Sequence, residues 1–318
     1  MGTALVIILF VVGIVLIVKG GDWFVDAAVW IAETSGIPKF LIGATVVSFA
    51  TTLPELLVSV MAALDGKNGM AVGNAVGSVT ANIGLIMAIS VIFIPVVINR
   101  KTFAFKPLLM IASISALILF SLGGELKFIG SVIILCMFAV FITESIVSAK
   151  KTIGTESEKK EKSTGREIAT GIFKFIAGTA GIIIGARLLV DNGSKIAEML
   201  GVPEAIISVT VIAIGTSLPE LVTTITAIVK KQANLSVGNI IGANIIDLTL
   251  IMPICAVITG GSLPIAKQSL CLDLPVCALV CAFSVIPALI AGKFRRWQGF
   301  ALLGTYILYL IILIIFFI

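Results

Sequence analysis

Ala-Thr-Thr-Leu-Pro-Glu at residues 50–55 recurs as Gly-Thr-Ser-Leu-Pro-Glu at residues 215–220, 165 positions later. The match extends without a gap from Gly20–Ser90 to Gly185–Cys255, with 25 identities in 71 aligned pairs. A repeat of this length indicates two copies of one structural unit within the chain.

The chain around these hexapeptides is too apolar for a soluble protein. Of its 318 residues, 59% are hydrophobic and only 12% are charged, and the mean hydropathy is +1.20. Apolar runs of about 20 residues, long enough to cross ~30 Å of hydrocarbon, recur along the whole length. We therefore predict an all-α polytopic membrane protein with no soluble catalytic domain. The ten predicted spans are roughly 4–32, 37–63, 70–97, 104–123, 126–148, 167–197, 202–229, 235–260, 265–291 and 297–317.

One long polar stretch, rich in Lys, Glu, Ser and Thr, divides these spans five from five. It predicts a first five-helix repeat at 1–149, a solvated linker at 150–166 and a second five-helix repeat at 167–318. Because each repeat contains an odd number of spans, the second enters the membrane from the opposite side. Two inverted repeats around a central site are an architecture of secondary transporters.

The basic residues predict the orientation, since Lys and Arg collect in cytoplasmic loops. With the first residue outside, fifteen basic residues fall in inner loops and three in outer loops. The fifteen are Lys39, Arg100, Lys101, Lys106, six between Lys150 and Arg166, Lys230, Lys231, Lys293, Arg295 and Arg296. We expect a plasma-membrane protein with both termini outside and a cytoplasmic linker. The net charge of +5 thus reflects topology and gives no sign of nucleic-acid binding.

Glu55 and Glu220 end the two hexapeptides and lie inside apolar runs. A carboxylate at mid-membrane is costly unless a partner compensates it. No basic residue lies close to either glutamate in sequence, so a bound cation is the natural partner, although protonation also neutralises a carboxylate. Asp26 and Asp191, which the repeat also pairs, are expected to have a structural or gating role.

A proline precedes each glutamate and breaks the helix where carbonyl oxygens are needed. Pro54 and Pro219 have no N–H for the carbonyl four residues earlier, and their rings push that carbonyl aside. The carbonyls of Thr51 and Thr216 can then turn inward. Irregular backbone at this depth is tolerated only where it lines a cavity or is buried in protein.

A second pair of polar segments, residues 73–82 and 238–247, supplies further oxygen atoms. Asn82 and Asp247 are equivalent in the repeat and can complete a ligand shell, although Ser and Asn in membrane helices often only join helices. Carboxylates, hydroxyls and carbonyls suit hard cations such as Ca²⁺ and Na⁺. The chain has no histidine and its five cysteines form no Cys-x-x-Cys pair, which argues against zinc and disulfides.

These paired motifs resemble the α-repeats of the calcium/cation antiporter superfamily, and within it the sodium/calcium exchanger family. The resemblance implies ten transmembrane helices, cation sites between the second, third, seventh and eighth, sliding first and sixth helices, and exchange of several Na⁺ for one Ca²⁺. By position, it implies Ca²⁺ binding by Glu55 and Glu220 with the carbonyls of Thr51 and Thr216. The sodium sites would be surrounded by Thr52, Ser217, Ser78, Asn82, Asp247 and the carbonyls of Ser48 and Ala213.

One departure leaves the coupling ion open, because Ala243 stands where the second repeat of this family often has serine. An antiporter of the same fold coupled to H⁺ or K⁺ is the alternative, and a channel is a further rival. An intramembrane aspartyl protease would need two facing aspartates, whereas the duplicated acids here are glutamates. We expect no resident cofactor and no obligate protein partner.

Overall fold

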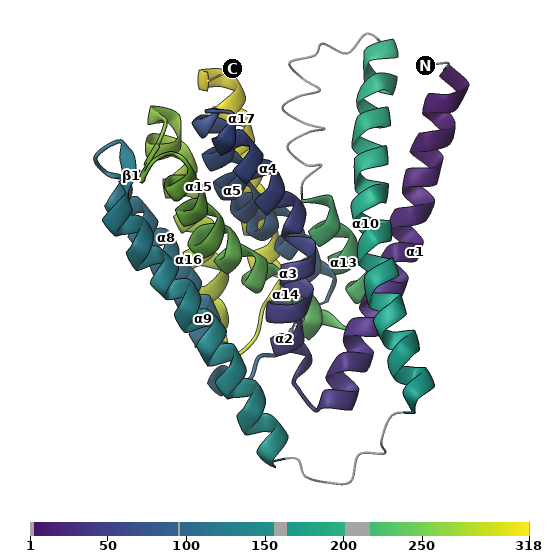
Figure 1. Cartoon of the computed structure of the whole chain (residues 1–318). Coiled ribbons are helices and arrows are strands. Elements are labelled where there is room, and N and C mark those ends of the chain that lie inside the picture. Colours follow the sequence, from purple (N-terminus) through teal and green to yellow (C-terminus); the bar gives the residue numbers. More distant parts are fainter. Residues whose placement is uncertain (1–2, 95, 156–163, 201–216, 318) are drawn as a thin grey trace.

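The computed structural model describes residues 3–94, 96–155, 164–200 and 217–317, and these residues are almost entirely helical. Figure 1 shows long helices lying side by side, with both termini at one end of the bundle and the end of α9 and the start of α10 at the other. We call the first end the terminal face and the second the linker face.

The elements follow the predicted spans closely. The first half comprises α1 (Thr3–Ser35), α2 (Lys39–Ile42), η1 (Gly43–Val47), α3 (Ser48–Thr51), α4 (Leu53–Leu64), α5 (Asn68–Ala81), η2 (Asn82–Met87), α6 (Ala88–Phe93), α7 (Arg100–Phe103), α8 (Phe105–Ser121), β1 (Glu125–Lys127) and α9 (Phe128–Thr155). The second half comprises α10 (Gly165–Met199), α13 (Leu218–Val229), α14 (Ala233–Ile246), η4 (Asp247–Ile251), α15 (Met252–Ile258), β2 (Ser262–Pro264), η5 (Ser269–Asp273), α16 (Leu274–Ala291) and α17 (Arg296–Phe317). The η elements are π-helical turns that continue their neighbouring helices.

Among the described residues, seven helices are long and apolar enough to cross a membrane. The segments Lys39–Thr51 and Leu53–Leu64 form an eighth candidate span, bent by 44°. Phe105–Ser121 and Leu218–Val229 are shorter apolar helices. The first part of the predicted span 202–229 lies outside the described residues. The expectation of an all-helical membrane protein is confirmed.

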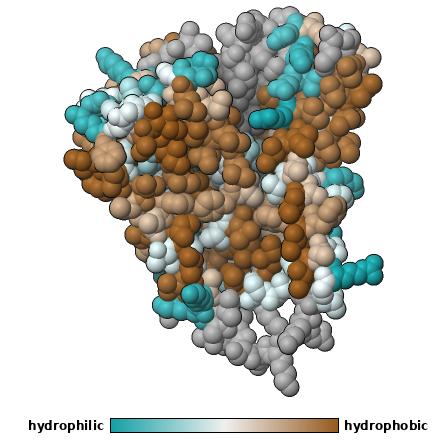
Figure 2. All heavy atoms as spheres, viewed as in Figure 1, coloured by the Kyte–Doolittle hydropathy of each residue, from teal (hydrophilic) through white to brown (hydrophobic). Residues whose placement is uncertain are grey.

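The apolar side chains are distributed as a membrane protein requires. Large hydrophobic residues are exposed along α1, α9, α10 and α17, whereas α5 and α14 are largely buried at the centre of the bundle. Figure 2 shows hydrophobic surface over most of the middle of the molecule, with hydrophilic residues toward its ends. Lipid therefore replaces water around the bundle, and polar groups inside it must find partners within the protein.

Helices α1 and α10 are antiparallel and in direct backbone contact (Figure 1). A Cβ atom on Gly20 would lie 2.9 Å from the carbonyl oxygen of Gly178, and one on Gly185 would lie 2.8 Å from that of Gly13. Small residues permit this close approach of membrane helices. The long first and sixth predicted spans thus form one tightly packed pair.

The structure adds two details to the predicted organisation. The ends of the predicted linker 150–166 are helical, because α9 continues to Thr155 and α10 begins at Gly165. Two short strands were also missed: β1 pairs with β2 in an antiparallel sheet, with Leu126 opposite Leu263. These three-residue strands satisfy the backbone groups of two loops through hydrogen bonds to each other.

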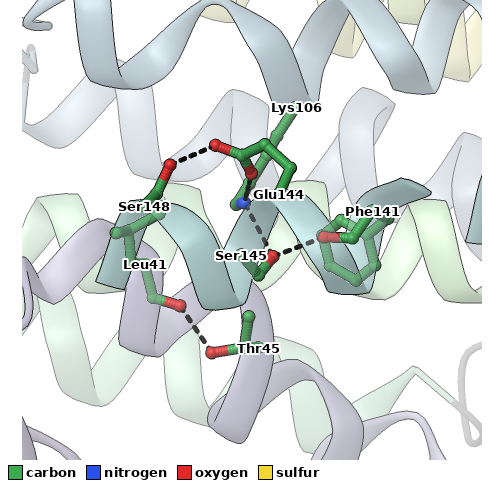
Figure 3. Close-up of polar contacts among 7 residues, drawn as sticks. All are labelled: Leu41, Thr45, Lys106, Phe141, Glu144, Ser145 and Ser148. Atoms are coloured by element: carbon green, nitrogen blue, oxygen red, sulfur yellow. Dashed lines mark hydrogen bonds and ion pairs between the residues drawn. The ribbon is translucent and has the colours of Figure 1, made fainter. Parts of the chain in front are cut away.

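Lys106, expected in an inner loop, is instead fully buried at the start of α8. Figure 3 shows its ammonium group directed at α9, where it forms an ion pair with Glu144 and donates to Ser145 Oγ at 2.8 Å. The ammonium lies 5.2 Å from the centre of the Phe141 ring, and Ser148 donates to the second carboxylate oxygen of Glu144. This cluster fixes α8 to α9 and does not report on topology.

Replacing Glu144 by Gln should destabilise the protein more than removing the whole ion pair. A buried charge left without its partner costs about 3–5 kcal/mol, whereas replacing both charges is often nearly neutral. We expect Glu144→Gln to lower the unfolding temperature in detergent, and Lys106→Met with Glu144→Gln to recover most of the loss. Equal losses in the two variants would contradict a role based on charge pairing.

Candidate cation site

Three acidic side chains are buried where α4, α13 and η4 meet. The residues Glu55, Glu220 and Asp247 are at most 1% exposed. Their charges act on one another, since Glu220 and Asp247 both repel Glu55 electrostatically, and Glu220 repels Asp247. None of their six carboxylate oxygens has a hydrogen-bond partner among the described residues. Such a cluster of acceptors without donors requires either protons or a bound cation.

The break in the second predicted span presents Glu55 at a helix start. Helix α3 ends at Thr51, and α4 begins at Leu53 with Pro54 in its first turn. Because a proline needs no N–H partner at this position, it favours the beginning of a new helix. Glu55 then lies in the first turn of α4, where the helix dipole stabilises negative charge.

The second hexapeptide has the same geometry. Helix α13 begins at Leu218, with Pro219 and Glu220 in its first turn. The residue before each helix has nearly the same conformation: φ −83° and ψ −2° at Thr52, and φ −87° and ψ 7° at Ser217. Two helix N-termini therefore direct their positive ends toward the region that holds the two glutamates.

The two π-helical turns at the centre begin at equivalent positions, η2 at Asn82 and η4 at Asp247. Single π-turns within α-helices often mark functional sites. Asn82 donates through Nδ2 to Oδ1 of Asn244 at 3.0 Å, which leaves the buried Oδ1 of Asn82 without a donor among the described residues. The three acids and Asn82 together hold seven of the eleven buried side-chain oxygens without a partner among the described residues, namely the six carboxylate oxygens and this amide oxygen.

Two asparagines support the glutamates from behind. Asn74 donates to the backbone carbonyl of Glu55 at 3.1 Å and to Ser59 Oγ at 2.9 Å. Asn239 accepts from the Thr51 hydroxyl at 3.2 Å and donates to Thr223 Oγ1 at 3.1 Å. Asn239 therefore joins α3 to α13 across the two halves of the chain. The 165-residue shift pairs Asn74 with Asn239, although neither asparagine was among the predicted site residues.

The other predicted residues take three positions around this centre. Ser48, Thr51 and Thr52 are buried, and the hydroxyl of Thr52 donates to the carbonyl of Ser48 at 2.7 Å. Ser217 and Ser78 bring their hydroxyl oxygens within 3.4 Å of each other. Ala213 and Thr216 lie outside the described residues.

Close backbone contact holds Ser48 against α14. A Cβ atom on Gly242 would lie 2.4 Å from the carbonyl oxygen of Ala44 and 2.5 Å from Ser48 Oγ. One on Gly238 would lie 2.2 Å from the carbonyl of Phe40. Only glycine fits at these positions. Gly238 and Gly242 therefore determine how closely α14 approaches the segment Lys39–Thr51.

Among the described residues, no group of three or more His, Cys, Asp or Glu side chains is arranged to hold a metal ion by itself. A cation between the glutamates would therefore also require hydroxyl, amide or backbone carbonyl oxygens. Oxygen ligands of this mixed kind are those that Ca²⁺ takes in proteins.

Comparison with known proteins places the chain among membrane transporters. The family model described as "Sodium/calcium exchanger protein" matches residues 5–147 and 170–315. The inner membrane protein YrbG of Escherichia coli is 34% identical over 319 residues, covering 96% of this chain and 95% of YrbG. The sodium/calcium exchanger MaX1 of Methanosarcina acetivorans is 28% identical over 348 residues, covering 96% of this chain and 97% of MaX1. The solved structure of the sodium-calcium exchanger NCX_Mj superimposes with a TM-score of 0.83 at 28% identity, covering 98% of this chain and 99% of that one.

Adding a methyl group at Gly242 should disturb the site through packing alone. Gly242→Ala forces the backbone of α14 away from Ala44 and Ser48, and overpacking of this kind costs about 1–3 kcal/mol. We expect a lower unfolding temperature and weaker cation binding. Gly304→Ala on α17, where no described atom beyond the adjacent backbone of the same helix lies within 4 Å of the added carbon, is the control and should behave like the wild type. Equal behaviour of the two variants would contradict the close-packing argument.

Proposed function

The chain belongs to the sodium/calcium exchanger protein family, whose members are transporters and not enzymes, and we propose that it exchanges Ca²⁺ for Na⁺ across the plasma membrane by alternating access. The observation that carries this proposal is the set of seven buried acceptor oxygens without donors among the described residues. A cation pocket explains such a set, because a bound cation is coordinated directly by carboxylate and amide oxygens and takes the place of hydrogen-bond donors.

Charge balance explains why ion movement in the two directions would be coupled. Glu55 and Glu220 carry two negative charges when ionised, which one Ca²⁺ or two Na⁺ offset. An ionised Asp247 adds a third negative charge, which a third Na⁺ offsets. Bare carboxylates moved through a low-dielectric barrier without a cation are strongly disfavoured. The protein then changes its facing direction only when loaded, which produces exchange and prevents leakage.

For Ca²⁺ we propose the carboxylates of Glu55 and Glu220 with the carbonyls of Thr51 and Thr216. The sodium sites draw on neighbouring oxygen atoms. These belong to Thr52, Ser217, Ser78, Asn82 and Asp247 and to the carbonyls of Ser48 and Ala213. We propose no resident cofactor, because the ions are the substrates, and no obligate protein partner.

The helices support an arrangement of ten spans in two inverted repeats, residues 1–149 and 167–318. The seven long helices, the bent pair and the two shorter apolar helices make ten. Helices α4 and α13 both have 12 residues, α5 and α14 both have 14, and each pair is offset by 165 positions. With the linker cytoplasmic, both termini lie outside, in agreement with their common position at the terminal face (Figure 1).

A second candidate function keeps the fold but couples Ca²⁺ to H⁺ or K⁺. It is favoured by Ala243, which is fully buried on α14 and provides no hydroxyl where Ser78 does so in the first repeat. Protons suffice to neutralise glutamates, so a proton-coupled cycle needs no further ligand.

Radiolabelled Ca²⁺ uptake into proteoliposomes distinguishes these functions. Vesicles loaded with Na⁺ should accumulate Ca²⁺, choline-loaded vesicles should not, and Glu55→Gln or Glu220→Gln should abolish uptake because each removes a central charge. Uptake that is driven by a pH gradient and is indifferent to internal Na⁺ would overturn sodium coupling. Uptake that persists in both glutamate variants would overturn the site itself.

Restoring the hydroxyl at position 243 should strengthen sodium binding. Ala243→Ser adds one oxygen ligand, and a contact worth about 1 kcal/mol corresponds to roughly a fivefold change in affinity. We expect half-maximal Ca²⁺ uptake at lower internal Na⁺, with a steeper Na⁺ dependence. Ala256→Ser, a buried alanine of α15, is the matched control. No shift between the two variants would remove Ala243 as a determinant of coupling.

A further inference from the structure

An ion-pair cluster ties α1 to α13 at the linker face. Lys230, directly after α13, donates to Asp26 Oδ1 at 2.6 Å and to the carbonyl of Asp22 at 2.9 Å. Its ammonium lies 3.4 Å from Asp22 Oδ1, and Lys174 of α10 lies 3.7 Å from Asp26. We call the contact between Lys230 and the two aspartates the linker-face ion pair.

Close packing accompanies this ion pair. A Cβ atom on Gly21 would lie 2.8 Å from Thr226 Oγ1 and 2.9 Å from a methyl carbon of Val222. The α1 backbone therefore rests directly on α13, and no gap separates the two helices beside the acids. The linker face is closed between α1 and α13 in this structure.

The repeat assigns this ion pair a counterpart with both charges reversed. The 165-residue shift places Arg187 on Asp22, and Lys230 on Asp65. Asp22 and Lys230 therefore correspond to Arg187 and Asp65, two groups of opposite charge with both signs inverted, whereas Asp26 corresponds to Asp191, which keeps its sign. If the two repeats exchange conformations, Arg187 and Asp65 take the places of Asp22 and Lys230, and the two groups in contact again have opposite charges.

The backbone confirms that Asp65 and Lys230 are equivalent positions. Asp65 follows the last residue of α4, and Lys230 follows the last residue of α13. Each is succeeded by a left-handed residue, Gly66 with φ 72° and Lys231 with φ 57°. The amide of Asp65 donates to the carbonyl of Met61 at 3.0 Å, and that of Lys230 to the carbonyl of Thr226 at 2.9 Å.

The counterpart is open in this structure. Arg187 and Asp191 of α10 line a cavity of about 280 Å³ whose other wall includes Leu57 and Val58 of α4. Arg187 forms no ion pair with any described residue, and Asp65 is paired with its exposed neighbour Lys67 at 3.4 Å. Helix α1 is packed directly on α13, whereas the equivalent helices α10 and α4 are separated by this cavity.

We propose that Asp65 and Arg187 form a second ion pair, which closes the terminal face when the linker-face ion pair opens. The proposal rests on the exchange function proposed above. In the opposite-facing state, α10 packs on α4 as α1 now packs on α13, and Lys230 is released from Asp22 and Asp26. The two ion pairs exclude each other, so each stabilises one facing direction of the site.

The two ion pairs differ in strength. Lys230 faces two acids, Asp22 and Asp26. Arg187 would face Asp65 with Asp191 one helical turn away, and these two acids repel each other. The linker-face ion pair, in which one lysine contacts two acids, is thus the stronger of the two.

Cross-linking tests the proposal directly. One variant carries Asp22→Cys with Lys230→Cys, and a second carries Asp65→Cys with Arg187→Cys. In both, the exposed Cys136 and Cys271 are replaced by Ser. A short bis-methanethiosulfonate, which joins two thiols through reducible disulfides, should link each pair in part of the molecules, with the balance shifting between Na⁺, Ca²⁺ and ion-free solutions. Each cross-link should abolish exchange, and reduction should restore it.

A variant with Asp22→Cys and Asp65→Cys, which joins opposite faces, is the control and should never cross-link. Failure of the Asp65/Arg187 cysteine pair to cross-link in every ionic condition, while the Asp22/Lys230 pair links, overturns the proposal. Cross-links that leave exchange intact overturn it as well. Cross-linking is detected by gel electrophoresis, and Ca²⁺ exchange is measured separately before the reagent is added. A missing second ion pair can therefore be distinguished from a missing exchange function.

A milder pair of variants covers the case in which the cysteine variants do not fold. A single reporter, Val58→Cys in the cavity wall, is labelled by a soluble thiol reagent. Lys230→Met should slow the labelling because the terminal face closes more often, and Asp65→Asn should hasten it. Equal labelling rates in the two variants would overturn the proposal.

Discussion

Three carboxylates buried at the centre of a membrane protein, without hydrogen-bond donors among the described residues, are the constraint on which the other features depend. A buried acceptor without a partner is costly, and a cluster of charged ones is more so. Folding tolerates Glu55, Glu220 and Asp247 because helix N-termini face the glutamates and asparagines hold the surrounding backbone. The negative charge of these carboxylates, which no described donor compensates, then favours the binding of a cation.

The same constraint accounts for the irregular backbone at mid-membrane. The break at Thr52, the π-turns that begin at Asn82 and Asp247, and the glycine contacts of α14 all lie around the carboxylates. Regular helices elsewhere, such as α9 and α17, pair their own backbone groups and contact lipid. The irregular backbone around the carboxylates lies where oxygen atoms are needed, and α1 with α10 packs beside it as a separate, glycine-lined pair.

Much of this was predictable from sequence because hydropathy and a 165-residue repeat are strong signals. They located the spans and identified Glu55 and Glu220, which the structure buries together with Asp247. The bridging role of Asn239 was not predictable, since it depends on α3 and α13 meeting across a sequence distance that no local pattern encodes. Burial of Lys106 was missed for a related reason: its partner Glu144 lies 38 residues away, and a lysine at the start of a span resembles a topology signal.

Equilibrium binding of radiolabelled Ca²⁺ to the purified protein in Na⁺-free solution tests the central role of the buried carboxylates most directly. Wild-type protein should bind about one Ca²⁺ per chain, Na⁺ should displace it, and Glu55→Gln with Glu220→Gln should abolish binding. Undiminished Ca²⁺ binding in a correctly folded double variant would contradict the assignment of these carboxylates as the cation site.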